Sequence, residues 1–352
     1  MLNEIVQPLI SWYRQNKRIL PWRDQKNAYY TWVSEIMLQQ TRVEAVKPYF
    51  LRFIGELPDV KVLAECPEEK LMKLWEGLGY YNRVRNMQSA AQVVVAEYGG
   101  VLPASYDELL ALKGIGSYTA GAIASIAYDI PVPAVDGNVL RVFSRITEDR
   151  QDIMKQSVRS QVEEKLLGIM PKDAPGDFNQ ALMELGAVVC VPNGPARCME
   201  CPVAALCKAY HHGTVDELPV KAPKKKRTIE NKTVLVIQDG ECTAIRKRPQ
   251  EGLLAGLYEL PNVEGHLSMD EALQKVKEMN LEPLHIEALP EAKHIFSHIE
   301  WRMIGYRIHV SSLEERKEAP FIFIEKKQSE KQYAIPSAFR AYIKYMKEKP
   351  GK

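Results

Sequence analysis

Two carboxylic acids stand in sequence contexts that suit opposite roles in acid catalysis. Glu35 lies in the apolar segment "TWVSEIMLQQT", where burial would raise its pKa and keep a proton available near neutral pH. Asp136 lies in "PAVDGNVLRV", directly before a helical pattern, where it can cap the helix and stay ionised. Acid-catalysed cleavage of a bond to a sugar can use such a pair, because the leaving group must be protonated and the sugar becomes cationic.

Both residues also have structural interpretations. Glu35 would suit the first turn of a helix that is capped by Thr31, and the residues alone favour this interpretation. Asp136 would cap the following helix whatever its chemistry, and the two roles are compatible.

Four of the six cysteines crowd into one segment, "CVPNGPARCMECPVAALC", with the spacing C-x7-C-x2-C-x5-C. They are Cys190, Cys198, Cys201 and Cys207. Disulfides are disfavoured in a reducing cytoplasm, so we interpret the segment as a metal site and the following His211 and His212 as surface residues. Clustered thiolates without histidine suit either zinc or an iron–sulfur cluster, and the spacing alone does not choose between them.

The segment "LKGIGSYTAGAI" has the residues of a tight turn between two helices. Ser105 and Glu108 have the spacing of a capping box at the start of the first helix. Gly114 and Gly116 permit positive φ and leave backbone N–H groups open at the start of the second helix, where a DNA phosphate can bind. A plain corner between helices explains the glycines equally well.

The elements that carry these residues must belong to more than one domain, because 352 residues exceed one ordinary core. Residues 1–212 show helical periodicity and no strong strand pattern. Residues 213–230 contain prolines and five basic residues from Lys221 to Arg227, which is the composition of a linker. Residues 231–352 combine β-branched runs with a helical pattern at "SMDEALQKVKEMN" and a last helix from Pro336, which predicts an α+β domain.

The composition argues against a membrane protein and says little about partners. Hydrophobic residues make up 46% and charged residues 26%, and no apolar run approaches the roughly 18 residues of a membrane span. The start of the chain, "MLNEIVQPLISWYRQNKRI", predicts an amphipathic helix and not a signal peptide, so we expect a cytoplasmic protein. A net charge of +2 does not by itself indicate a nucleic-acid partner.

The order of three segments carries more information than any one of them. "LKGIGSYTA", "PAVDGNVLRV" and the cysteine segment, in that order, resemble the helix-hairpin-helix DNA glycosylases of the endonuclease III superfamily. With "LPWR", "WVSEIMLQQTRVE" and "WEGLGYYNRVRN", the resemblance narrows to adenine DNA glycosylases of the MutY type and covers essentially the whole chain. It implies a six-helix barrel at about residues 21–128, an iron–sulfur cluster part formed by residues 1–20 and 129–212, and a Nudix-like domain at residues 231–352.

The resemblance assigns chemical roles to particular residues. It implies that Glu35 protonates adenine, that Asp136 faces the cationic sugar with Asn138 close by, and that Tyr118 forms hydrogen bonds within the site. Bifunctional relatives have a lysine where this chain has Tyr118, and a phenol cannot form their Schiff base, so we expect monofunctional hydrolysis that leaves an abasic site. The resemblance also implies a 4Fe-4S cluster on the four cysteines, although the family commonly has six residues between the first two cysteines and this chain has seven.

Other residues match positions that contact DNA in the family. Trp22, Arg23 and Leu38 match the adenine pocket, and extrusion of the base needs a wedge to fill the gap that it leaves. By resemblance Gln40, Thr41 and Tyr80 approach the opposite base and the emptied stack. Composition alone favours core packing for Tyr80 and its neighbour Tyr81.

The C-terminal region looks like a Nudix domain without the hydrolase function. It lacks the arginine–glutamate pair and the following glutamates that hold magnesium around a diphosphate. The resemblance implies that it reads 8-oxoguanine opposite the adenine, with Phe296, Ser297 and His298 in the contacting loop. The Ser297 hydroxyl can accept a hydrogen bond from the N7–H that oxidation creates. A hairpin turn with one packed aromatic residue is the structural alternative.

The sequence therefore predicts a monomeric adenine DNA glycosylase that acts on double-stranded DNA with adenine opposite 8-oxoguanine or guanine. An endonuclease III-like glycosylase for oxidised pyrimidines is one alternative, which Tyr118, the context of Glu35 and the C-terminal domain disfavour. A non-catalytic DNA-binding protein or a nucleotide hydrolase is the other, which the paired carboxylates and the missing hydrolase motif disfavour.

Overall fold

The computed structural model describes residues 2–223, 226–312, 321–325 and 332–347. The chain forms two compact units, one of Met1–Cys66 with Asn82–Pro223 and the other of Pro67–Tyr81 with Lys224–Lys352. Residues 213–230 were expected to form a linker, but the first unit extends to Pro223 and the first strand of the second unit begins at Thr228. Parts of the expected linker therefore belong to the two units. Lys224 and Lys225 of that basic segment lie outside the described residues.

The first unit is helical, as the periodicity predicts, and its described residues contain no strand. Its α-helices are α1 (Val6–Asn16), α2 (Ala28–Leu38), α3 (Val43–Glu56), α4 (Val60–Glu65), α6 (Asn82–Tyr98), α7 (Tyr106–Ala111), α8 (Ser117–Tyr128), α9 (Gly137–Thr147), α10 (Gln156–Leu167), α11 (Pro175–Val188) and α12 (Lys208–His212). Short 3-10 turns occupy Leu2–Ile5, Cys198–Glu200, Ala204–Leu206 and Val215–Glu217. No helix in the described part of the chain combines the length and the apolar character that crossing a membrane requires.

Helix α8 lies at the centre of this unit and is made largely of small residues. Its residues from Thr119 to Ser125 are all buried, and it packs against α2, α7 and α11. Gly121 allows the closest approach, because a Cβ atom there would lie 2.1 Å from the carbonyl oxygen of Pro133. The segment that leads to Asp136 can therefore pass directly beside the helix that carries Tyr118.

A buried asparagine forms hydrogen bonds to the same segment before Asp136. Asn179 of α11 is fully buried and accepts a hydrogen bond from the backbone N–H of Ala134 at 3.0 Å. Its amide donates to the carbonyl oxygen of Val132 at 2.9 Å and to the Ser125 hydroxyl at 2.8 Å. Because every polar atom in this network is paired, α8, α11 and the residues before Asp136 are held in one arrangement.

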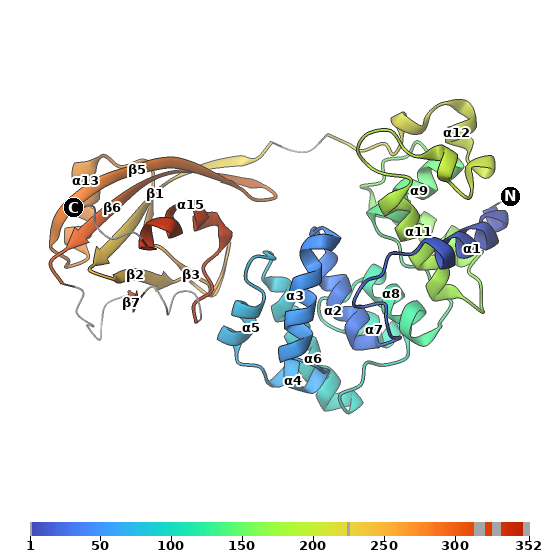
Figure 1. Ribbon diagram of the computed structural model, residues 1–352, viewed down its shortest axis with the longest axis horizontal. Helices are drawn as coiled ribbons and strands as arrows, with labels where there is room; N and C mark the ends of the chain where they lie inside the picture. Colours follow the sequence, from blue (N-terminus) through green and yellow to red (C-terminus); the bar gives the residue numbers. More distant parts are fainter. Residues whose placement is uncertain (1, 224–225, 313–320, 326–331, 348–352) are drawn as a thin grey trace. The chain divides into compact units, whose positions relative to one another are not determined.

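The second unit is an α+β structure, as the sequence predicts. Its strands are β1 (Thr228–Asp239), β2 (Cys242–Lys247), β3 (Tyr258–Glu259), β4 (Asn262–Glu264), β5 (Pro283–Ile295), β6 (Ile299–Val310) and β7 (Ile322–Glu325). Its α-helices are α5 (Glu68–Leu74), α13 (Met269–Glu278) and α15 (Arg340–Ile343). The sheet order is β3-β2-β1-β6-β5, with β4 beside β1 and β7 beside β2, and β1 pairs with β6 in parallel. Figure 1 shows β5 and β6 as long curved strands.

The sheet is covered on both faces, which explains why the four central residues of the β1 sequence "TVLVIQ" are all apolar. Val234 and Val236 pack into one hydrophobic cluster with Phe339 and Tyr342, whereas Leu235 and Ile237 pack into another that includes residues of α13. Helix α13 forms where the helical pattern predicts it and begins with a capping box of Ser268 and Glu271. Two details differ from the sequence pattern. The segment "LLAGLYELP" contributes only the short β3, and the expected last helix is a 3-10 turn followed by α15 and a second 3-10 turn.

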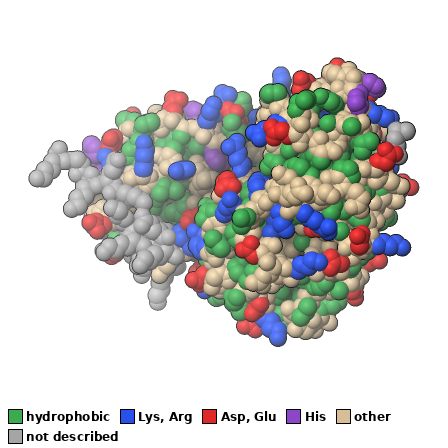
Figure 2. Space-filling view, turned by 45° about the vertical axis from the view of Figure 1, so that its right-hand side comes forward, with side chains coloured by type: hydrophobic (Ala, Val, Ile, Leu, Met, Phe, Trp, Pro, Cys, Tyr) green, Lys and Arg blue, Asp and Glu red, His purple; other side chains and the backbone are tan. Residues whose placement is uncertain are grey.

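Charge is mixed on the surface of the molecule. Figure 2 shows Lys and Arg side chains interspersed with Asp and Glu over the face in view. This agrees with the small net charge of +2 and indicates that binding of an anionic polymer depends on particular residues more than on the total charge.

Candidate active site

Glu35 is buried on α2, in surroundings that favour the protonated carboxyl group, and it does not lie at the start of the helix. The helix begins at Ala28 with Asn27 as its N-cap, so the prediction of a cap at Thr31 was wrong and Glu35 lies beyond the first turn. Glu35 is 7% exposed to solvent. Burial, the largest cause, and the charge of Asp136 raise the pKa of Glu35, whereas the hydrogen bond from Tyr118 and the charge of Arg23 lower it, and the result is a pKa of about 7. Glu35 therefore holds a proton near neutral pH.

Tyr118 contacts Glu35 directly from the start of α8. Its hydroxyl donates a hydrogen bond to Glu35 Oε2, across 83 residues of sequence. Burial and the neighbouring carboxyl groups raise the pKa of Tyr118 well above its usual value, so the phenol keeps its proton and acts as a donor. Since Oε2 accepts from Tyr118, Oε1 is the oxygen left to carry the acidic proton.

Asp136 is the N-cap of α9, as the sequence predicts, and two donors hold it. One carboxylate oxygen accepts from the backbone N–H of Val139 at 2.8 Å, and the other accepts from Asn138 Nδ2 at 2.7 Å. Burial is the largest influence and raises the pKa of Asp136, whereas these hydrogen bonds and the charge of Arg141 lower it. The donors thus favour the ionised form in a site where burial alone would disfavour it.

Asn138 also links Asp136 to the cysteine segment, through a residue that the sequence analysis missed. Asn138 Oδ1 accepts from Arg141 Nη2 at 3.0 Å, and the same guanidinium donates to the carbonyl oxygens of Gly186 at 2.7 Å and Cys190 at 2.9 Å. Arg141 is 5% exposed, so its orientation is fixed by these acceptors. Asn138 and Arg141 are neighbours on α9, but nothing in the order of the residues reveals the link to Gly186 and Cys190, which lie 45 and 49 residues away.

Glu35, Tyr118, Asp136 and Asn138 line one cleft of about 1040 Å³, which has room for a nucleoside. Five of the predicted DNA-contacting residues line the same cleft, namely Trp22, Arg23, Leu38, Gln40 and Thr41. Trp22 is 6% exposed and packs edge-on against Phe50, with ring centroids 5.4 Å apart, so it forms a fixed wall. The cleft therefore joins the acid, the carboxylate and the predicted base pocket.

The turn after α2 presents Gln40 in an uncommon conformation. Gln40 has a φ of 61°, in the left-handed region, and Thr41 follows it. Arg83 of α6 fastens this turn, because its Nη1 donates to the carbonyl oxygens of Ile36 and Gln39 at 2.6 Å each. Arg83 was not a predicted site residue. It caps the end of α2 and fixes the backbone from which Gln40 projects.

Two arginines and a buried glutamate form a second charged group at the cleft. Glu184 of α11 is fully buried and accepts from the backbone N–H and the side chain of Arg18 and from Arg23 Nη2 at 2.9 Å. Arg18 and Glu184 were also missed from the sequence. The available signal was a lone acid in the apolar helix "ALMELGAV", the same kind of signal that pointed to Glu35.

The glycine turn between α7 and α8 has the predicted helix-hairpin-helix form. Ser105 caps α7 through the backbone N–H of Glu108 at 3.4 Å. Gly114 has a φ of 81°, and a Cβ atom there would lie 2.7 Å from the Asn86 side chain, so glycine is required on both grounds. Gly116 has a φ of −95°, so the expectation of positive φ was wrong for this residue, although a Cβ there would meet nothing within 4 Å.

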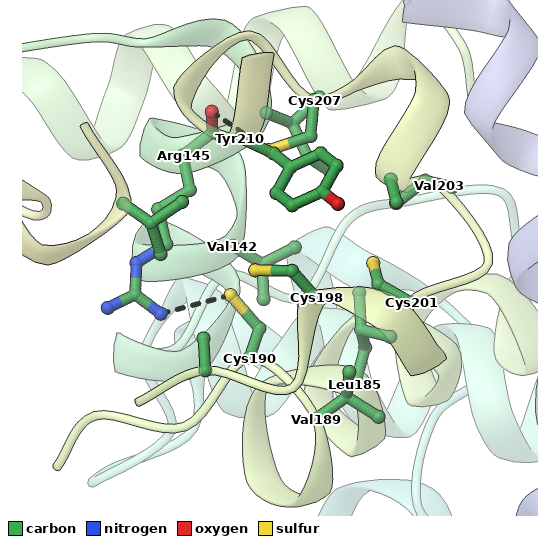
Figure 3. A pocket seen from close by; sticks show the side chains of 14 residues that line it. Val142, Arg145, Leu185, Val189, Cys190, Cys198, Cys201, Val203, Cys207 and Tyr210 are labelled. Carbon is green, nitrogen blue, oxygen red and sulfur yellow. Dashed lines mark hydrogen bonds between the residues drawn. The ribbon is translucent and has the colours of Figure 1, made fainter. Parts of the chain in front are cut away.

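The four cysteines of the predicted metal site line one pocket, which Figure 3 shows from close by. Arg145 of α9 donates from Nη1 to Cys190 Sγ at 3.2 Å, and Cys207 Sγ donates to the Arg145 carbonyl oxygen at 3.4 Å. His211 and His212 are exposed, as expected. Within the described ranges, no group of three or more His, Cys, Asp or Glu side chains is arranged to hold a metal ion.

The donor set nevertheless fits a metal group that prefers sulfur. Four cysteines that form no disulfide, Cys190, Cys198, Cys201 and Cys207, surround one pocket beside α9. The loop between Cys190 and Cys198, which has the extra residue, contains Gly194 with a φ of 75° and open space beside it. A glycine in this conformation lets the longer loop turn tightly while both cysteines stay at the pocket.

The predicted 8-oxoguanine loop is the turn between β5 and β6 in the second unit. Phe296 packs edge-on against Trp301, with centroids 4.9 Å apart, whereas Ser297 and His298 are exposed. Tyr80, from the Pro67–Tyr81 segment of the same unit, is 48% exposed, and its hydroxyl lies 3.0 Å from Ser297 Oγ. Its neighbour Tyr81 is 6% exposed, so core packing describes Tyr81 and not Tyr80.

The fold and the cleft define the class of the protein. Residues 33–168 match the HhH-GPD superfamily of base excision DNA repair proteins, and residues 233–345 match the NUDIX domain. A thermostable thymine-DNA glycosylase is similar in structure, with a TM-score of 0.53 and 26% sequence identity over 60% of this chain and 97% of that chain. The chain is thus a base excision repair protein of the HhH-GPD superfamily with a C-terminal NUDIX domain.

The particular family follows from two close relatives. The adenine DNA glycosylase of Mus musculus is 36% identical, across 87% of this chain and 70% of the mouse protein. The adenine DNA glycosylase of Buchnera aphidicola subsp. Baizongia pistaciae is 34% identical, across 83% of this chain and 82% of that protein. This chain belongs to the adenine DNA glycosylase family, whose members are hydrolases of N-glycosyl bonds, and the resemblance predicted from its sequence is confirmed.

Proposed function

We propose that this protein hydrolyses the N-glycosidic bond of adenine opposite 8-oxoguanine, and more weakly opposite guanine, in duplex DNA. The hydrogen bond from Tyr118 to Glu35, inside the cleft that also contains Asp136, is the observation that carries the proposal. Glu35 donates its proton to a ring nitrogen of the extruded adenine, which makes the base a neutral leaving group. The C–N electron pair leaves with the base, and the cationic sugar lies opposite the Asp136 carboxylate.

Water completes the reaction in this proposal. It adds to the anomeric carbon and loses a proton, so the products are free adenine and an abasic site with both strands intact. The high pKa of Tyr118 supports this outcome, because a neutral phenol neither attacks the sugar nor forms an imine. A lysine at this position would permit strand cleavage through a Schiff base.

Single-turnover base release tests the reaction. The substrate is a duplex with one adenine opposite 8-oxoguanine, and alkali reveals the abasic site as a strand break. We expect alkali-dependent cleavage by the intact protein, its loss in Glu35→Gln, and its retention in Glu164→Gln, which makes the same chemical change at an exposed position of α10. Efficient trapping of a protein–DNA adduct by borohydride would contradict the monofunctional mechanism.

Recognition of 8-oxoguanine is assigned to the exposed hydroxyl pair of the second unit. The Ser297 hydroxyl, on a turn that Phe296 anchors by packing, lies 3.0 Å from the Tyr80 hydroxyl, so the pair can present an acceptor to the N7–H of the oxidised base. Ser297→Ala and Tyr80→Phe should each lower the ratio of rates for 8-oxoguanine and guanine. Ser311→Ala, an exposed serine beyond the other end of β6, is the matched control. An unchanged ratio in both hydroxyl variants would remove this pair from recognition.

Cys190, Cys198, Cys201 and Cys207 hold a 4Fe-4S cluster in this proposal. When bound, the cluster would cross-link the cysteine segment to itself, and this segment contacts Arg145 of α9 through Cys190. Iron and sulfide analysis of the purified protein, with visible absorbance, should give about four of each per chain in the intact protein and less in Cys201→Ser. One zinc per chain would instead support the zinc alternative. The proposal places the protein in the cytoplasm, where thiolate ligands persist, and has it act as a monomer on DNA.

A further inference from the structure

A buried charge cluster of two arginines and one glutamate lies at the cleft but has no role in the reaction described above. Glu184 Oε1 accepts from Arg18 Nε at 2.6 Å and from the Arg18 backbone N–H at 3.1 Å, and Oε2 accepts from Arg18 Nη2 at 3.1 Å and Arg23 Nη2 at 2.9 Å. Glu184 is fully buried, and the Arg23 side chain is 15% exposed. All three residues line the cleft with Glu35.

The position of Arg23 is fixed on several sides. Besides its bond to Glu184, Arg23 Nη1 lies 3.5 Å from the Arg18 carbonyl oxygen, and the guanidinium lies 5.7 Å from the centroid of the buried Tyr13 ring. A buried carboxylate with three guanidinium donors is ionised, because each donor favours the charged form. The cluster therefore has two positive charges and one negative charge, and its arrangement is set before any substrate binds.

We propose that Glu184 is a positioning residue that aims Arg18 and Arg23 at the cleft and balances their charge beside the catalytic acid Glu35. This inference rests on the proposed function, since it concerns the protonation of the acid in that reaction. The groups that act on the pKa of Glu35 are Tyr118 of α8, Asp136 at the start of α9, and Arg23, whose charge Glu184 of α11 offsets. The other charged residues of the cleft are Arg18, Arg42, Glu44 and Arg159. The other residues of α2 carry no charge.

The sign of the effect follows from electrostatics. A positive charge near a carboxyl group stabilises the carboxylate, so an unbalanced Arg23 would lower the pKa of Glu35 and remove its proton at lower pH. Glu184 keeps the net positive charge beside the acid small enough for Glu35 to stay protonated near neutrality. Removal of an arginine must have the opposite effect to removal of the glutamate.

The test measures the single-turnover rate of adenine release as a function of pH. Glu184→Gln keeps the size of the side chain and removes its charge, and we expect the midpoint of the alkaline decline to fall by about one pH unit. The rate at pH 8 should then drop about fivefold more than the rate at pH 6. Arg18→Gln, at a side chain that is 33% exposed, should move the midpoint upward.

Asp177→Asn is the matched control, because Asp177 also lies on α11 and pairs with an arginine, Arg14 at 2.8 Å, away from the cleft. Its profile should coincide with that of the intact protein. Lower rates at every pH with unmoved midpoints in Glu184→Gln and Arg18→Gln would overturn the inference and leave Glu184 as a structural residue. If Glu184→Gln does not fold, the Arg18→Gln profile tests the inference by itself. An upward shift of its midpoint supports the inference, and an unmoved midpoint overturns it. Failure of the intact protein to release adenine would instead overturn the proposed function.

Discussion

The stability of the protein should depend on pH through Glu35. Burial raises the pKa of this carboxyl group from 4.5 to about 7 in the folded protein, whereas the unfolded chain keeps the ordinary value. Each pKa unit corresponds to about 1.4 kcal/mol, so the folded state binds this proton more tightly than the unfolded chain by about 3 kcal/mol. Because the folded pKa is the higher one, this stabilisation is complete below pH 4.5 and is lost as the pH rises through about 7.

Glu35→Gln has no proton to lose at this site, so it isolates the effect. Between about pH 4 and about pH 8, the intact protein should lose about 3 kcal/mol of its free energy of unfolding relative to this variant. Urea denaturation followed by tryptophan fluorescence measures the difference at each pH, with Glu164→Gln as the control for an exposed carboxyl group. Parallel pH profiles for the intact protein and Glu35→Gln would refute the reasoning. They would mean that Glu35 ionises normally in the folded state and has no proton to donate near neutrality.

The segment around Asp136 gives two further predictions. Asn138→Ala removes a 2.7 Å hydrogen bond that favours the Asp136 carboxylate, so the pKa of Asp136 rises further. The acidic limb of the pH–rate profile should then move to higher pH by about one pH unit, the equivalent of about 1.4 kcal/mol. An unmoved acidic limb would show that Asp136 does not need this donor. Gly121→Ala would place a Cβ atom 2.1 Å from the Pro133 carbonyl oxygen and should cost about 2 kcal/mol or more in stability, measured by thermal unfolding. Gly55→Ala in α3, where a Cβ meets nothing within 4 Å, is its control and should be neutral or slightly stabilising.

The sequence by itself determined the features that depend on local order. Asp136 caps α9 because a carboxylate before a helix start can bond its free N–H groups, and Ser268 caps α13 for the same reason. The helix-hairpin-helix turn follows from Gly114, which needs a φ that other residues rarely adopt. The apolar residues around Glu35 indicate its burial, although they do not give the start of α2, which Asn27 caps four residues before the expected Thr31.

The resemblance supplied what local order could not, namely the substrate family and the roles of Glu35 and Tyr118. Other residues escaped both kinds of reasoning. Arg83, Arg141 and Glu184 act on side chains or carbonyl groups that lie far away in the sequence, and an arginine or glutamate in a helix is usually a solvated surface residue.

Only the tertiary structure decided which groups meet. Tyr118 reaches Glu35 across 83 residues, and Arg23 reaches Glu184 across 161 residues. These contacts exist because α8 and α11 pack closely enough on their neighbours to bury polar groups, and a buried polar group must find its partner within the protein. The protonation of Glu35 is likewise a property of the packed cleft, since burial and the surrounding charges set its pKa and neither exists in the unfolded chain.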